Sequence, residues 1–140
     1  MSKVFVYTDG GSRGNPGQAA LGVYITDENN RQLFSAGKRL GQATNNVAEY
    51  SAILAALSWL IDNKSKFIPQ TQIYFYMDSL LAYSQLVGLF KVKNPNLRNI
   101  LFEIRKKEQQ LDLTINYSHI RREKNKKADR LVNLALDNKL

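Results

Sequence analysis

The 140-residue sequence contains no cysteine and only one histidine, His119. The lack of cysteine excludes disulfides, cysteine-based zinc sites and cysteine nucleophiles, and a single histidine leaves few ligands for soft metals. No apolar run is long enough to cross a bilayer, and no basic and apolar leader precedes the first predicted strand. We therefore expect a cytoplasmic protein without a membrane segment.

Negative charge is also scarce in this chain. Lysine and arginine number 20 against 12 aspartates and glutamates, which gives a net charge of +8 and favours a polyanion as partner. The basic residues concentrate in two stretches, 91–107 and 121–130. Either stretch could instead be a solvated helix face that serves solubility. The second stretch, however, surrounds the acidic residue Asp129.

The apolar pattern changes its period along the chain and predicts nine elements. Three alternating segments with a turn signal at 27–30 indicate an antiparallel meander. Apolar residues at three- and four-residue steps over 47–61 then indicate a helix laid against the sheet, which Asn45 or Asn46 could cap. With no repeat and no flexible linker, residues 1–140 are expected to form one mixed α/β domain. The predicted strands are 3–9, 19–26, 31–40, 72–77 and 112–119, and the predicted helices are 47–61, 79–89, 96–110 and 124–138.

Four acidic residues occupy positions where a carboxylate contributes little to the stability of a protein unless a cation binds it. Asp9 and Asp78 each close an apolar strand, Asp9 at a sharp glycine turn, while Glu49 and Asp129 lie on helices packed on the same sheet. Four converging carboxylates would repel one another unless divalent ions neutralised them. A site built from oxygen alone selects Mg²⁺ or Mn²⁺, and two such ions can activate water and stabilise a leaving oxygen at phosphorus.

Four ordered motifs are spread across nearly the whole chain: Tyr7–Gly17, Thr44–Tyr50, Tyr76–Ser79 and His119–Arg130. They resemble the motifs of the type 1 ribonuclease H family. The resemblance implies a ribonuclease H-like fold, in which a five-stranded mixed sheet of three antiparallel and two further strands is flanked by helices. It implies endonucleolytic hydrolysis of the RNA strand of RNA–DNA hybrids, leaving 5′-phosphate and 3′-hydroxyl ends. It also implies that Asp9, Glu49, Asp78 and Asp129 hold two Mg²⁺ ions, for which Mn²⁺ could substitute.

The same resemblance assigns further roles. The backbone at Gly10 and Gly11, with Asn15 and Asn45, matches positions that read RNA 2′-hydroxyl groups, which separate RNA from DNA. Thr44 matches a position that binds a phosphate of the DNA strand. His119 matches a histidine that assists proton transfer or product release, although its position alone would favour a merely polar residue at a strand end. The residues expected to contact the hybrid are Gly10, Gly11, Ser12, Asn15, Thr44, Asn45, Asn46 and Asn125.

One segment departs from many family members. They carry a basic protrusion after the helix that follows the third carboxylate, whereas residues 89–95 here connect directly to the next helix. We expect a subgroup that lacks the protrusion, in which Lys91, Lys93 and Arg98 replace it in reduced form. Hybrid binding should then be weaker and more sensitive to salt.

Two other functions are weighed against hybrid cleavage. One is a catalytically silent nucleic-acid-binding module, but such a module has no use for clustered anions that face a polyanion. The other is a junction-resolving or integrase-like nuclease, which would keep the metals and change the substrate. The asparagines at 15, 45 and 46 favour recognition of 2′-hydroxyl groups over that alternative. We expect the protein to act on hybrids as a monomer.

Overall fold

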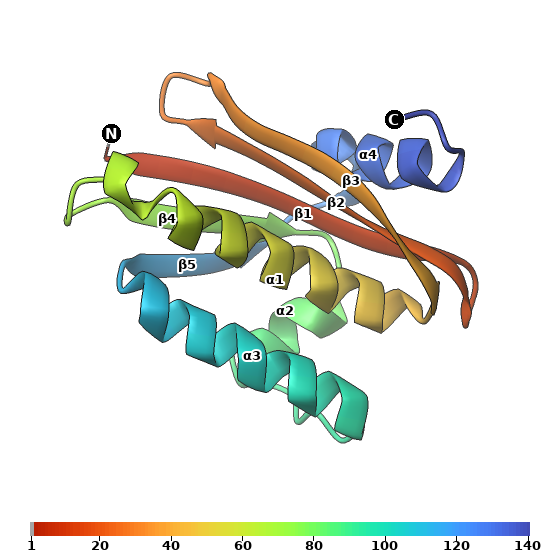
Figure 1. Cartoon of the computed structure of the whole chain (residues 1–140). Helices are drawn as coiled ribbons and strands as arrows, with labels where there is room; N and C mark the ends of the chain where they lie inside the picture. Colours follow the sequence, from red (N-terminus) through yellow and green to blue (C-terminus); the bar gives the residue numbers. More distant parts are fainter. Residues whose placement is uncertain (1) are drawn as a thin grey trace.

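The computed structural model describes residues 2–140 and contains one five-stranded sheet (Figure 1). The strand order is β3-β2-β1-β4-β5; β1, β2 and β3 are antiparallel, and β4 and β5 run parallel to β1. The mixed sheet predicted from the sequence is thereby confirmed. The strands are β1 (Lys3–Gly14), β2 (Gly17–Asp27), β3 (Gln32–Ala43), β4 (Gln72–Met77) and β5 (Thr114–His119).

Strand β1 is longer than predicted, and the sharp turn expected directly after Asp9 is wrong. The ladder with β2 continues from the pair Asp9 and Gly22 to the pair Gly14 and Gly17, so the glycines belong to a long hairpin. The parallel pairing of β1 with β4, in contrast, stops at Tyr7. Asp9 therefore lies just beyond the point where the two central strands separate, and this position gives its side chain room for a site.

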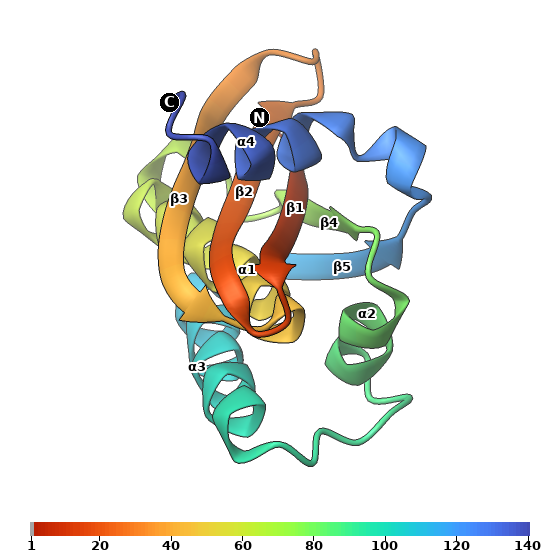
Figure 2. The ribbon, with the colours of Figure 1, turned by 90° about the vertical axis from the view of Figure 1, so that its right-hand side faces the viewer.

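Helices cover the two faces of the sheet unequally (Figure 2). Helix α1 (Asn45–Asp62) packs on one face with α3 (Pro95–Leu111) against it, and their apolar side chains share the main core with β1, β2 and β4. Helix α4 (Lys126–Leu136) crosses β3, β2 and β1 on the other face, where Ala20, Val132 and Ala135 form a small second cluster. The site lies between these two layers.

The start of α1 differs from the prediction. Thr44, not an asparagine, is the N-cap: its Oγ1 accepts a hydrogen bond from the Val47 N–H at 3.2 Å. Asn45 is the first helical residue. Because threonine and asparagine are both good caps, the sequence did not distinguish neighbouring positions.

Glycines in the sheet set how closely both helix layers approach. A Cβ atom at Gly10 would lie 2.2 Å from the Ala48 backbone carbon and 2.3 Å from the Glu49 nitrogen. A Cβ atom at Gly22 would lie 2.3 Å from the Ala128 carbonyl oxygen of α4. Such contacts are shorter than any side chain tolerates, so only glycine lets α1 and α4 pack directly on the strands. This packing carries Glu49 and Asp129 toward Asp9.

The remaining connections are short. Helix α2 (Leu80–Leu86) ends earlier than the predicted residue 89, ahead of Gly88, whose φ is +84°. Residues 87–94 join α2 to α3 without a helix. Two single turns complete the fold, η1 (Lys64–Lys66) after α1 and η2 (Arg122–Lys124) before α4.

Candidate active site

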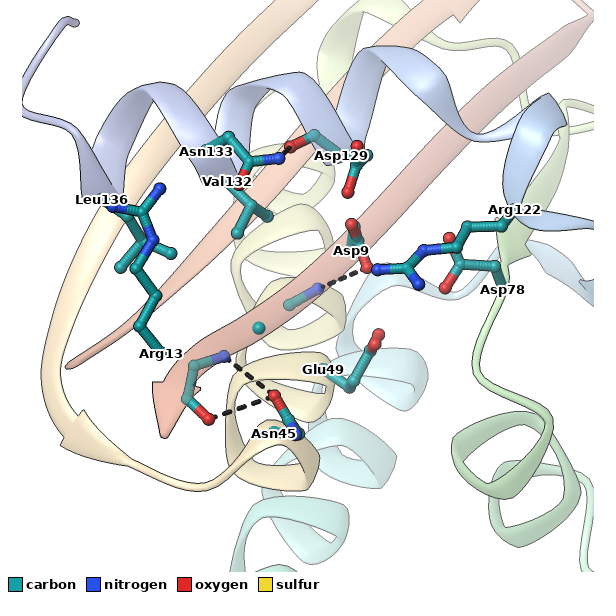
Figure 3. Close-up of a pocket in the computed structure, with 13 residues that line it drawn as sticks. Asp9, Arg13, Asn45, Glu49, Asp78, Arg122, Asp129, Val132, Asn133 and Leu136 are labelled. Atoms are coloured by element: carbon teal, nitrogen blue, oxygen red, sulfur yellow. Dashed lines mark hydrogen bonds between the residues drawn. The ribbon is translucent and has the colours of Figure 1, made fainter. Parts of the chain in front are cut away.

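Three of the four predicted carboxylates form one cluster. Asp9 of β1, Glu49 of α1 and Asp78, which directly follows β4, each offer an oxygen atom within 4.8 Å of the others. Asp129 of α4 lines the same hollow, whose volume is about 420 Å³. Figure 3 shows the four side chains directed toward this common space from four different elements. The topology thus brings together residues that are up to 120 positions apart, from 9 to 129.

The cluster has a buried side and an open side. Asp9 and Glu49 are only 6% and 8% exposed, whereas Asp78 and Asp129 are partly exposed. Asp9 accepts a hydrogen bond from the Gly10 N–H at 2.9 Å, which fixes one of its oxygens. A ligand would therefore reach Asp9 and Glu49 past Asp78 and Asp129.

Burial and mutual repulsion make this cluster electrostatically costly. Burial, followed by the negative charges of Asp78 and Asp129, raises the pKa of Asp9 to about 7. Burial is also the largest cause that raises the pKa of Glu49 well above its ordinary value, with Asp9 and Asp78 adding to it. These shifts mean that the protein alone does not compensate the negative charge.

Arg122 is a site residue that the sequence did not single out. It lines the hollow, and its positive charge lowers the pKa of Asp9 and of Glu49 against the larger effects that raise them. Its guanidinium lies beside Asp9 in Figure 3. Arg13, on the hairpin, also lines the hollow but forms an ion pair with Asp137 at 2.6 Å. Arg122 lies among other basic residues and Arg13 in a glycine-rich segment, and neither pattern indicated which arginine faces the carboxylates.

Asn125 lies beneath the cluster rather than on an open surface. It is 1% exposed, and its Nδ2 donates to the Thr8 carbonyl at 2.9 Å and to Asp78 Oδ2 at 3.1 Å. The sequence placed this residue among those that touch the hybrid. In the structure its amide ties the segment before α4 to β1 and orients Asp78, and its contact with the hybrid stays a prediction.

Three of the predicted hybrid-contacting residues connect the hairpin to the start of α1. Asn45 Oδ1 accepts hydrogen bonds from the Ser12 N–H at 2.8 Å and from Ser12 Oγ at 3.1 Å. Asn15 Oδ1 accepts one from the Asn45 N–H at 3.0 Å. All three residues are exposed or partly exposed beside the carboxylates, and Ser12 and Asn45 line the hollow. The network presents neutral polar groups where a substrate strand would pass.

The other predicted contacts lie close to this network. Gly10 and Gly11 line the hollow along β1. Thr44 uses its hydroxyl as the helix cap and is partly buried, as is the neighbouring Asn46.

His119 lies at the rim of the site. It ends β5, and its Nε2 is 3.2 Å from the Asp78 carbonyl oxygen. Its ring centroid is 6.2 Å from that of Tyr83 in α2. The imidazole is exposed and is held next to Asp78 without being part of the wall of the hollow.

The donor set fits a hard divalent cation. All four side chains offer carboxylate oxygens, two of them buried, and no sulfur or imidazole enters the cluster of close ligands. The raised pKa of Asp9, at about 7, shows that negative charge remains unpaired despite Arg122. A divalent ion among Asp9, Glu49, Asp78 and Asp129 would remove that penalty.

Comparison with known proteins identifies the family. Residues 7–135 match the family described as Reverse transcriptase-like. The structure of LC11-RNase H1, isolated from compost by a metagenomic approach, is 42% identical in sequence, covers 99% of this chain and 98% of its own, and superposes with a TM-score of 0.90. The chain belongs to the ribonuclease H type 1 family.

A second structure of the same relative and one further protein extend this comparison. A structure of LC11-RNase H1 in complex with RNA/DNA hybrid is 41% identical, with a TM-score of 0.91 over 96% of this chain and 97% of the other. A bifunctional protein of Mycobacterium tuberculosis is 39% identical over 136 residues, which are 96% of this chain but 36% of that protein. The chain spans about a third of the length of the first curated relatives that it matches. Among residues 2–140, no helix has the length and apolar character needed to cross a membrane.

Proposed function

We propose that this protein hydrolyses the RNA strand of RNA–DNA hybrids and leaves 5′-phosphate and 3′-hydroxyl ends. The observation that carries this proposal is the cluster of Asp9, Glu49 and Asp78, whose oxygens lie within 4.8 Å of one another, with Asp129 on the same wall. The similarity to LC11-RNase H1, which has been captured with an RNA/DNA hybrid, supports the choice of substrate.

The four carboxylates would hold two Mg²⁺ ions, with Mn²⁺ as a substitute. When bound, the ions would supply activation of the attacking water and neutralisation of the developing charge at the scissile phosphate. Asn125 would keep Asp78 oriented through its hydrogen bond of 3.1 Å. Outer partners of this kind typically change metal affinity or activity by about 10–100-fold.

The remaining polar groups would bind and position the substrate. Ser12, Asn15 and Asn45 form a neutral network beside the carboxylates, suited to the 2′-hydroxyl groups of the RNA strand. His119, held at the Asp78 carbonyl, would move a proton at the leaving oxygen or help the product to depart. Arg122 would meet a phosphate at the mouth of the hollow.

The DNA strand would be held without a separate protrusion. Residues 87–94 form no helix, and Lys91 and Lys93 of this connection are exposed. We expect these lysines, with Arg98, to contribute a reduced basic surface. Affinity for hybrid should therefore be weaker than in protrusion-bearing relatives, and equal affinity would argue against this part of the proposal. Because fewer phosphate contacts release fewer counterions, the affinity should also fall less steeply with salt, which corrects the greater salt sensitivity expected from the sequence.

A substrate panel tests the proposed function. Labelled RNA–DNA hybrid, double-stranded RNA, double-stranded DNA and a four-way junction are each incubated with Mg²⁺, Mn²⁺ or chelator, beside the Asp9→Asn variant. The proposal predicts cleavage of the RNA strand of the hybrid only when metal is present, and loss of cleavage in the variant. Binding without cleavage would indicate a silent module, and preference for the junction would indicate a resolving nuclease.

A further inference from the structure

A second surface, polar and aromatic, lies on the same face of the sheet as α4, on the part that this helix does not cover. Side chains alternate along a strand, so Phe5 and Tyr7 of β1 share this face with Asp9. Tyr7 pairs with Tyr24 of β2 and with Tyr76 of β4, which makes a row of three tyrosines across the sheet. We call these rings, together with Phe5 and Tyr74, the aromatic platform.

The rings of the platform are in contact and only partly buried. Tyr7 and Tyr76 stack with centroids 5.2 Å apart, and Phe5 and Tyr74 stack at 5.5 Å. All of these rings keep exposed surface, and in Figure 2 no helix crosses β4 or β5 on this face. Partly exposed, stacked aromatic rings on an open sheet are suited to stacking with the planar bases of an unpaired strand.

Basic side chains border the platform. A hollow of about 460 Å³ is lined by Tyr7 and Tyr24 together with Lys124, Lys126 and Lys127. Glu123 and Asn30 complete its lining, so one carboxylate faces three ammonium groups. Lys127 Nζ lies 5.3 Å from the centroid of the Tyr24 ring.

At the other end of the platform, Lys3 lies on the same face of β1 as Phe5 and is exposed. Cations at both ends and aromatic rings between them match the alternation of phosphates and bases in nucleic acid.

The platform is separate from the candidate active site but adjoins it. The turn η2 lies between the two, since Arg122 lines the carboxylate hollow and Glu123 and Lys124 line the other. Along β1, Asp9 and Tyr7 are alternate residues, about 7 Å apart at the rise of a strand. A strand bound at the carboxylates could therefore pass over η2 onto the tyrosines.

We propose that the aromatic platform binds single-stranded RNA, namely the unpaired RNA that flanks a hybrid at the active site. The identity of the strand rests on the proposed function, because the carboxylates act on the RNA strand. Within each row the rings cover one another's faces, so the stacking faces for two successive bases are those of the terminal rings Tyr76 and Tyr74, whose neighbours in β5 are Ser118 and Asn116. The lysines at 3, 124, 126 and 127 would meet the phosphates.

The first arm of the test measures binding without cleavage. Fluorescence anisotropy of a labelled oligouridylate is recorded in chelator for the wild-type protein, Tyr76→Leu and the double variant Lys124→Gln/Lys126→Gln. Losing one stacked base should weaken binding about 5- to 150-fold in Tyr76→Leu. Losing two phosphate contacts should reduce the salt slope of the double variant by about 1.4. Lysines 124 and 126 are exposed, so the double variant should fold and still measure binding to the platform if the tyrosine variant is unstable.

The matched control is Lys106→Gln/Lys107→Gln, which removes the same charge from α3, on the opposite layer of the fold. It should bind oligouridylate nearly as well as the wild-type protein. Unchanged binding in both platform variants, or an equal loss in the α3 control, would overturn the proposal.

The second arm identifies the strand. The affinity for a blunt hybrid is compared with that for hybrids carrying an RNA or a DNA overhang, at each end in turn, using the Asp9→Asn protein. An RNA overhang at one end should tighten binding, and Tyr76→Leu should remove this gain. A DNA overhang with the same gain would refute the assignment to RNA. Oligouridylate binding that depends on the platform, in a protein that cleaves no hybrid, would uphold the platform while refuting the proposed nuclease.

Discussion

The candidate active site has a buried side and an open side, called here the inner and the outer side, and the two differ in how closely the surrounding elements pack. Asp9 and Glu49 are buried where β1 and α1 meet, and the close approach at Gly10 leaves them little freedom. Asp129 and His119 lie on a helix and at a strand end, and both keep exposed surface. The inner side therefore creates the electrostatic demand for a cation, and the outer side completes a site that the substrate can enter.

The largest expected effect is the loss of an inner carboxylate. Asp9→Asn should lower the single-turnover rate of hybrid cleavage by about 10³-fold or more, beyond the usual range for one preorganised electrostatic group. The outer variant Asp129→Asn should cost less, about 10²-fold, because water and added metal can partly replace an exposed ligand. A larger loss in Asp129→Asn than in Asp9→Asn would break the distinction between the two sides.

The outer histidine should matter for proton movement rather than for metal binding. His119→Ala is expected to slow hybrid cleavage about 10²-fold, at the lower end of general acid–base effects, with the Mg²⁺ concentration for half-maximal rate unchanged. The rate is measured across pH at saturating Mg²⁺. If added Mg²⁺ restored the activity of His119→Ala, the histidine would belong to the metal site instead.

Asn125 connects the two sides, so its removal should affect the metal dependence. Asn125→Ala removes the hydrogen bonds to Asp78 Oδ2 and to the Thr8 carbonyl, and we expect a loss of about 10–100-fold in activity or metal affinity. Titration of the cleavage rate with Mg²⁺ measures this change. A variant that only binds hybrid less tightly would instead support direct contact between Asn125 and the substrate.

Adjacent glycines provide a test of how the inner side is built. Gly10→Ala would place a Cβ 2.2 Å from the backbone of α1, and we expect the free energy of unfolding to fall by about 1–3 kcal/mol or more. Gly11→Ala is the control, because its Cβ would lie 3.7 Å from Val132 Cγ1, an ordinary contact. Its stability should change by less than about 1 kcal/mol. Chemical denaturation measures both, and equal effects would contradict the role given to Gly10.

The smallest predicted effect is on the pH dependence of stability. The pKa of Asp9 is raised to about 7 in the folded protein from an ordinary value of 3.8, so the native state holds a proton that the unfolded chain has lost. The stability that this proton contributes is fully present below pH 3.8, the ordinary pKa, and is lost as the pH rises through about 7. Without metal, the melting temperature should therefore fall over this range.

Magnesium should reverse that trend. Above about pH 7 it should raise the melting temperature of the wild-type protein, and near pH 4 it should have little effect, because Asp9 and Glu49, whose pKa values are raised, then hold protons. Asp9→Asn is the control and should show a flatter pH dependence and a smaller response to Mg²⁺. A melting temperature of the metal-free wild-type protein that rises between these pH values would contradict the sign of the Asp9 shift.

The sequence predicted which carboxylates come together better than it predicted the backbone around them. Asp9 and Glu49, together with Asp78 of the outer side, could be placed together because each lies at the start or end of a strongly patterned predicted element, and such elements pack in few ways. The turn predicted after Asp9 was wrong because a pair of glycines is compatible both with a sharp turn and with a strand on which a helix packs closely. The end of the pairing between β1 and β4 opens the site, and that register comes from tertiary contacts.

The outer side was harder to predict for a different reason. Arg122 is one of several basic residues around Asp129, and only the turn η2 decides which of them faces the carboxylates. Asn125 was expected only to contact the hybrid, and its charged neighbours in the sequence gave no sign that its amide is buried against Thr8 and Asp78. Short irregular segments carry no periodicity, so their side-chain directions depend on the folded surroundings.

The central claim, that four carboxylates form one site for a pair of hard cations, is tested most directly by anomalous scattering from crystals grown with Mn²⁺ and an uncleaved hybrid. The account predicts two peaks about 3.5–4 Å apart, both within coordination distance of carboxylate oxygens from the set Asp9, Glu49, Asp78 and Asp129. Absence of a peak between these side chains at saturating Mn²⁺, or peaks bound by other residues, would contradict it.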